Sequence, residues 1–173
     1  DLQARGHRVA VLRFSNVFGA TDDYHDRVVP AFAKAAARNG TLEVRGADSV
    51  FDFTALDDVV EAVMKTIDAL IAGDGNLPPI DIVSGRATSL RELAAMALAN
   101  GDGEIVIAPP QDFYPSRFQG DPRPAERYLG WRPGCALEER VKRLVNAFHR
   151  SEQHHSGERN ENSESHSWLS ALL

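Results

Sequence analysis

The chain has 173 residues, of which 43% are hydrophobic and 25% are charged, a composition typical of one globular domain with its own core. Its formal net charge of −6 argues against a nucleic-acid partner and against an acidic membrane surface, because both require clustered Lys and Arg. No run approaches the roughly 20 apolar residues of a membrane span. The single cysteine, Cys135, excludes an internal disulfide and favours a cytoplasmic location. The histidines lack the spacing of zinc ligands, so no metal site is predicted.

Hydrophobic periodicity predicts strands that alternate with helices, which indicates an α/β fold. The first strand is apolar on both alternations, the pattern of a strand covered on both faces, and residues 16–19 after it have turn chemistry. Strands are predicted at residues 8–14, 42–45, 80–83 and 104–108. Helices are predicted at about residues 26–39, 57–73, 89–101, 121–130 and 137–149.

Several polar residues are expected to cap helices rather than to catalyse. Ser89 and Glu92 have the spacing of a capping box, in which each side chain satisfies a free backbone N–H group of the helix start. Asp57 or Asp58 is expected to cap the helix that ends at Gly73, because a helix amino terminus explains paired carboxylates without acid/base chemistry or a metal. Trp131 is predicted to pack in the core.

The last residues differ in composition from the rest. Residues 151–173 are dominated by Ser, Asn, His and Glu, which cannot bury enough apolar area to offset chain entropy. We therefore predict a folded portion at residues 1–150 and a polar, mostly disordered tail at residues 151–173.

Six short segments resemble motifs of one enzyme family in the family's own order. The first, VLRFSNVFG at residues 11–19, is similar to the family's LRF-x-NVYG segment, and the others follow at residues 28–32, 42–46, 52–59, 84–93 and 121–131. Together they resemble the NAD-dependent epimerase/dehydratase family, the extended short-chain dehydrogenases that act on nucleoside-diphosphate sugars. Within this family, the chain is similar to UDP-glucose 4-epimerase.

This resemblance implies the carboxy-terminal part of a Rossmann-type enzyme, with a small mixed α/β substrate-binding lobe. It implies a nucleoside-diphosphate sugar as substrate and NAD as cofactor in the complete enzyme. Near the nicotinamide it places Phe14 and Val17. The residues that it assigns to substrate binding are Asn16, Arg27, Val28, Glu43, Arg45 and Arg117.

The family's catalytic motif is missing from this sequence. Relatives use a Tyr-x-x-x-Lys pair, whose lysine lowers the pKa of the tyrosine, and a Gly-rich turn that holds NAD. No tyrosine of this chain is followed by lysine four positions later, and the Gly-x-G pairs lack a third glycine. We therefore assign no catalytic residue and expect that the chain alone neither catalyses nor binds NAD; whether it serves as an enzyme stays open.

Two other functions fit the same motifs. The chain could be part of a UDP-glucuronate decarboxylase, or a non-catalytic binding or scaffold protein derived from this family. Phe51 stands where many relatives have a phosphate-binding arginine, which leaves the subfamily open. The apolar first strand also predicts self-association through an exposed strand edge.

Overall fold

The structure is a computed structural model that describes residues 2, 5–24, 26–73, 77–99, 101–109 and 116–169, with side chains as far as residue 153. Its helices are α1 (Val28–Ala37), α2 (Leu56–Ala72), α3 (Leu90–Leu98), α4 (Arg123–Leu129) and α5 (Leu137–Leu169). Its strands are β1 (Leu12–Phe14), β2 (Asn16–Phe18), β3 (Thr41–Val44), β4 (Val50–Phe51), β5 (Phe53–Ala55), β6 (Ile80–Ile82), β7 (Thr88–Ser89) and β8 (Glu104–Ile107). The predicted α/β class is confirmed.

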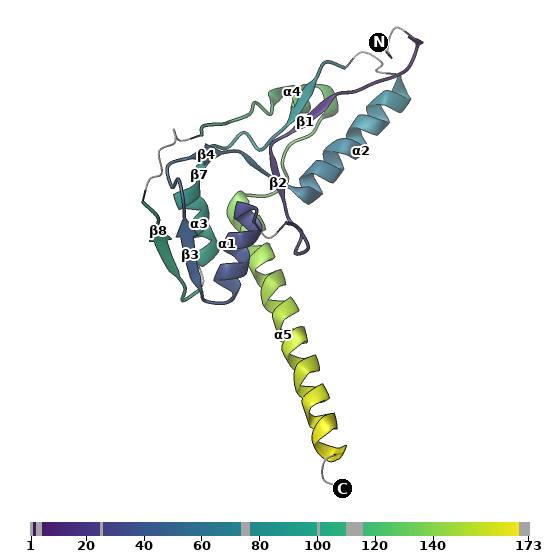
Figure 1. The fold of residues 1–173 in the computed structure, drawn as a ribbon. Coiled ribbons are helices and arrows are strands. Elements are labelled where there is room, and N and C mark those ends of the chain that lie inside the picture. Colours follow the sequence, from purple (N-terminus) through teal and green to yellow (C-terminus); the bar gives the residue numbers. More distant parts are fainter. Residues whose placement is uncertain are drawn as a thin grey trace.

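The strands pair two by two between distant parts of the sequence. Three pairs are parallel, namely β1 with β6, β2 with β5 and β3 with β8, whereas β4 and β7 are antiparallel. Parallel pairing requires a long crossover between the strands, and α1, α2 and α3 lie in these connections. Figure 1 shows α2 and α4 beside β1 at one end, and α1, α3, β3 and β8 at the other.

The first strand differs from its prediction in two ways. Only Leu12–Phe14 forms strand β1, and the expected cover on both faces is wrong for the described chain, since Val11 is 50% and Phe14 47% exposed. The predicted turn at residues 16–19 is also wrong, because Asn16–Phe18 forms strand β2 beside Phe53–Ala55. Pairing with a strand distant in sequence overrides the turn preference of Asn16.

Two apolar cores stabilise the two ends. In the first, α1, α3 and α5 pack around β3 and β5, with Leu42, Val44 and Leu93 almost fully buried. In the second, α2 and α4 pack on β6 around Trp131, which is 0% exposed. The indole Nε1 of Trp131 donates to the Asp58 carbonyl oxygen at 2.9 Å, so its predicted role in packing is confirmed.

The predicted helix caps are confirmed in part. Ser89 Oγ accepts from the Glu92 N–H at 3.2 Å, and the Ser89 N–H donates to Glu92 Oε2 at 2.7 Å, which makes a complete capping box. Gly73 ends α2 in the left-handed region at φ 111°. The cap predicted at Asp57 or Asp58 is wrong: both carboxylates lie inside the first turn, where Arg140 binds them.

Helix α5 continues beyond its predicted end near residue 149 and remains helical to Leu169. Figure 1 shows its last turns extending away from the two cores. Arg38 Nε pairs with Glu152 Oε1 at 2.5 Å, so α5 contacts α1's carboxyl end past residue 150. Residues 170–173 lie outside the described chain, and the division at residue 150 stays a prediction. None of the described helices is long and apolar enough to cross a membrane.

Candidate functional site

A cavity of about 160 Å³ lies between β2 and the amino end of α1. Four of the eight residues predicted for the site line it, namely Asn16, Val17, Arg27 and Val28. Four further lining residues were not predicted from the sequence, namely Phe18, Val29, Pro30 and Phe53. All four lie in the segments that resemble family motifs, and this location could have identified them as site residues.

Asn16 is held in this cavity by strand pairing and by its own side chain. Its backbone N–H donates to the Asp52 carbonyl oxygen at 3.2 Å, and its side-chain Nδ2 donates to the same oxygen at 3.3 Å. The residue is half-buried. The amide therefore has a fixed position at the cavity wall.

The Asp52 carboxylate is fully buried and fixes the loops next to the cavity. It accepts hydrogen bonds of 2.8 Å from the Ser84 N–H, the Ser84 hydroxyl and the Gly85 N–H, and one of 3.4 Å from the Gly120 N–H. Several donors are what a buried carboxylate requires. Asp52 thus joins β5 to the loops that follow β6 and precede α4.

The amino end of α1 brings positive charge to the same cavity. Arg27 stands at the N-cap without a side-chain cap bond, and the first turn holds no acidic residue. Because Pro30 has no N–H group, the free donors of this turn are those of Val28 and Val29. Arg27 is 43% exposed and pairs with Asp23 at 3.4 Å. The free N–H groups, the helix dipole and the guanidinium together favour an anion.

The remaining predicted residues do not line this cavity. Phe14 lies exposed on β1. Glu43 and Arg45 form an exposed ion pair with each other at 2.9 Å. Arg117 is exposed and forms a bridge with Val50.

Phe51 packs against apolar side chains and brings no charge to the site. It replaces the arginine of the family motif, and its ring packs against Phe53 with the centroids 6.2 Å apart. Phe51 also contacts the first core.

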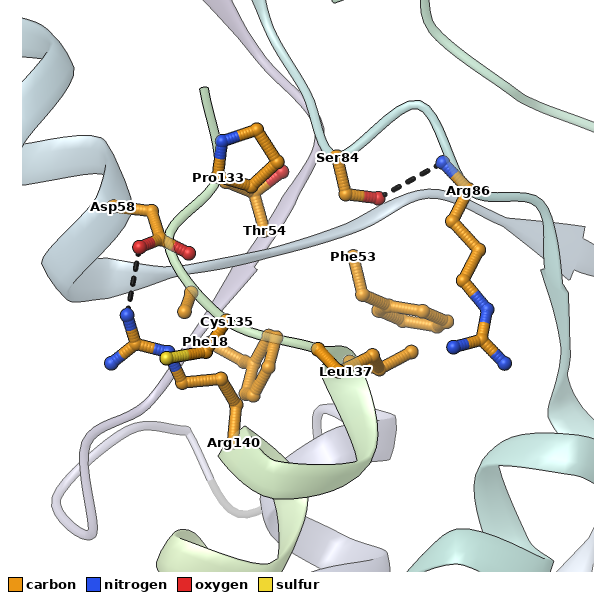
Figure 2. Close-up of a pocket in the computed structure, with 12 residues that line it drawn as sticks. Phe18, Phe53, Thr54, Asp58, Ser84, Arg86, Pro133, Cys135, Leu137 and Arg140 are labelled. Carbon is orange, nitrogen blue, oxygen red and sulfur yellow. Dashed lines mark hydrogen bonds and ion pairs between the residues drawn. The ribbon is translucent and has the colours of Figure 1, made fainter. Parts of the chain in front are cut away.

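A second cavity, also of about 160 Å³, shares Phe18 and Phe53 with the first as lining residues (Figure 2). Its charged groups already have partners. Arg86 Nη1 pairs with Glu138 at 2.6 Å, and Arg140 Nη2 pairs with Asp58 at 2.7 Å. The N–H group of Glu138 itself, and then the Arg86 guanidinium, lower the pKa of the Glu138 carboxyl. Both guanidinium groups are paired at shorter distances than Arg27 and Asp23. The helix that begins at this cavity, α5, also has Glu138 and Glu139 in its first turn, whereas α1 has no acidic residue there, so this cavity favours an anion less than the one beside Asn16.

The described residues of this site form neither a metal site nor a complete binding site for NAD. Among the described residues, no group of three His, Cys, Asp or Glu side chains could hold a metal ion. Val17 gives the cavity an apolar border of the kind predicted for the nicotinamide. The described strands and helices are nowhere joined by a Gly-rich turn that could hold the NAD pyrophosphate. No chemical step through NAD is therefore assigned to these residues.

Comparison with known proteins gives a consistent result. Residues 2–77 match the NAD dependent epimerase/dehydratase family. The crystal structure of the Thermotoga maritima UDP-glucose 4-epimerase with UDP-glucose superposes with a TM-score of 0.73 and 28% identity, over 86% of this chain and 48% of that one. The chain is therefore similar to the NAD-dependent epimerases and dehydratases. The predicted resemblance is confirmed.

Two curated relatives of this family carry different activities in their names. The UDP-glucose 4-epimerase of Mycolicibacterium smegmatis is 33% identical over 80% of this chain and 45% of the relative. The UDP-glucuronic acid decarboxylase 1 of Danio rerio is 27% identical over 88% of this chain and 36% of the relative. The chain thus spans less than half the length of each.

Proposed function

We propose that this chain is the nucleoside-diphosphate-sugar-binding portion of an NAD-dependent sugar epimerase/dehydratase, similar to UDP-glucose 4-epimerase. The observation that carries the proposal is the cavity where the uncapped start of α1, Arg27 and Asn16 meet. A diphosphate is the part of such a substrate that needs concentrated positive potential.

Each group of the cavity would have a distinct role toward this substrate. The N–H groups of Val28 and Val29 and the Arg27 guanidinium would bind diphosphate oxygens, and Asn16 would add one oriented amide. The apolar walls, Val17 and Phe18 among them, would exclude water around these bonds. Glu43, Arg45 and Arg117 remain proposed contacts outside the cavity, and Phe14 a proposed neighbour of the nicotinamide.

Catalysis needs more than this chain contains. When bound, NAD accepts and returns hydride, and the family's Tyr-x-x-x-Lys moves the proton. Since this sequence has no such pair, we propose that the chain is inactive by itself. The lone cysteine supports the further proposal of a cytoplasmic location.

A UDP-glucuronate decarboxylase is the second candidate, and the Danio rerio relative supports it. The substrates of the two candidate enzymes differ in the group at C5 of the sugar, which is a hydroxymethyl in UDP-glucose and a carboxylate in UDP-glucuronate. Tighter binding of UDP-glucuronate than of UDP-glucose would favour the decarboxylase. A scaffold protein without a ligand would bind neither sugar nucleotide.

Calorimetric titration of the chain with UDP-glucose, UDP and uridine tests the proposal directly. We expect saturable binding of UDP-glucose and UDP, and much weaker binding of uridine, because the diphosphate supplies most of the affinity. Arg27→Ala should weaken binding, and Arg38→Ala is the matched control, since Arg38 lies at the opposite end of the same helix. Equal binding by the two variants, or uridine bound as tightly as UDP, would contradict the proposed site.

A further inference from the structure

The loop between β2 and α1 places a carboxylate beside the cavity that Asn16 and Arg27 line. The Asp23 side chain is only 15% exposed, and its Oδ1 and Oδ2 lie 3.4 and 3.5 Å from Arg27 Nη1. The Tyr24 N–H donates to Asp23 Oδ1 at 2.8 Å, and the Arg27 N–H donates to the Tyr24 carbonyl oxygen at 3.1 Å. Asp23 is therefore held by the backbone of its own loop as well as by Arg27.

This ion pair leaves most of the Arg27 guanidinium available. Both contacts end on Nη1, and both are longer than the roughly 2.7–2.9 Å of a strong charge-assisted hydrogen bond. Within the described chain, no side-chain hydrogen bond of Arg27 uses Nε or Nη2. An anion can bind these two nitrogens, and the Asp23 carboxylate then stays next to that anion.

A fixed carboxylate at this point disfavours a ligand according to the ligand's own charge. The diphosphate of UDP-glucose is esterified at both ends, whereas the terminal phosphate of free UDP ionises a second time near about pH 6. Above that pH, UDP carries about one more negative charge than UDP-glucose. Arg27 and the start of α1 attract both ligands, but repulsion by Asp23 lowers the affinity for UDP more.

We propose that Asp23 is a specificity-determining residue, which favours a sugar-linked diphosphate over free UDP. The inference rests on the proposed binding of the diphosphate beside Arg27. Such a bias keeps the cavity open to an intact sugar nucleotide when free UDP is also present.

The size of the effect follows from one pair of like charges. The 3.4 Å contact, the width of the guanidinium and one hydrogen bond place the additional ligand charge roughly 8 Å from Asp23. At an effective dielectric constant of about 40, one like-charge pair at this distance changes a binding constant by about fivefold. Salt should weaken the effect, because the Debye length falls to about 3 Å at about 1 M.

Calorimetric titration of the whole chain with UDP and with UDP-glucose tests the proposal. Asp23→Asn removes the charge and keeps an oxygen that can accept from the Tyr24 N–H. Asp23→Ser repeats the test, since a serine hydroxyl can also accept this bond. Asp22→Asn is the matched control, because Asp22 is the adjacent, exposed carboxylate and forms no ion pair with Arg27 within the described chain. Circular dichroism checks that each variant is folded.

We expect the Kd for UDP, divided by the Kd for UDP-glucose, to fall about fivefold in both Asp23 variants at about 50 mM salt. In Asp22→Asn the same ratio should change by less than about twofold, and at about 1 M salt the Asp23 variants should differ little from the unchanged chain. An unchanged ratio in the Asp23 variants, or an equal change in Asp22→Asn, would overturn this inference and leave the sugar site standing. A chain that binds neither ligand would contradict both.

Discussion

The ion pair between Asp58 and Arg140 connects α2 to α5 and makes a quantitative prediction possible. Asp58 Oδ1 lies 2.7 Å from Arg140 Nη2, and the two side chains are only 5% and 12% exposed. The Gly134 N–H also donates to Asp58 at 3.2 Å. Arg140 Nη1 reaches Asp57 at 2.7 Å, but that carboxylate is 79% exposed.

These exposures predict a graded series of stability losses. Arg140→Leu leaves the buried Asp58 carboxylate with one backbone donor, and removal of one partner from a buried pair costs about 3–5 kcal/mol. Asp58→Asn leaves Arg140 with Asp57, so we expect a smaller loss of about 1–3 kcal/mol. Asp57→Asn removes only an exposed partner, which is worth at most about 1 kcal/mol.

Urea unfolding followed by circular dichroism measures the free energy of unfolding for each variant. Arg143→Leu is the control, because Arg143 pairs with Glu139 on the same helix at 57% exposure. The Asp58→Asn, Arg140→Leu double variant should lose less than the sum of the two single losses. Arg140 Nε is buried without a hydrogen-bond partner, which makes an apolar replacement of the pair more favourable. If Arg140→Leu and Arg143→Leu lose the same free energy within about 0.5 kcal/mol, the buried-pair reasoning is refuted.

Three further results are expected. Asn16→Ala should weaken UDP-glucose binding by on the order of 1–3 kcal/mol, measured by calorimetry, and unchanged affinity would make Asn16 a structural residue. The Ser89 N–H lowers the pKa of the Glu92 carboxyl below 4.5 in the folded chain. The stabilisation that the ionised carboxylate gives to the fold should therefore be complete above pH 4.5 and lost as the pH falls through the lower folded pKa. Glu92→Gln should remove this loss from acid unfolding curves. Deletion of residues 154–173 should leave the melting temperature nearly unchanged, and a large drop would show that these residues dock on the cores.

Local patterns in the sequence predicted the elements whose geometry depends on neighbouring residues. The capping box of Ser89 and Glu92 and the end of α2 at Gly73 are set within one helical turn, so their spacing identified them. Strand β2 was not predicted, because it exists only through pairing with residues 53–55. The partner of Asp57 and Asp58 was missed for the same reason, since Arg140 is about 80 residues away in sequence.

The predicted site residues also differ in whether their position depends on neighbouring or on distant parts of the sequence. Asn16 and Val17 are consecutive on β2, and Arg27 and Val28 are consecutive at the start of α1, so two short segments bring four predicted residues to one cavity. The other four come from segments whose placement depends on distant contacts. Their role toward a substrate stays a prediction.

Asp52 shows why a motif residue need not touch a substrate to matter for its site. Asp52 begins the family-like segment at residues 52–59, but no role was predicted for it from the sequence. Its carbonyl oxygen accepts both hydrogen bonds of Asn16, while its buried carboxylate binds the backbone of Ser84, Gly85 and Gly120. Charged groups are buried at great cost unless several donors satisfy them, so these loops and the Asp52 side chain constrain one another. The position of the Asn16 amide therefore depends on backbone held in place by a carboxylate that does not line its cavity.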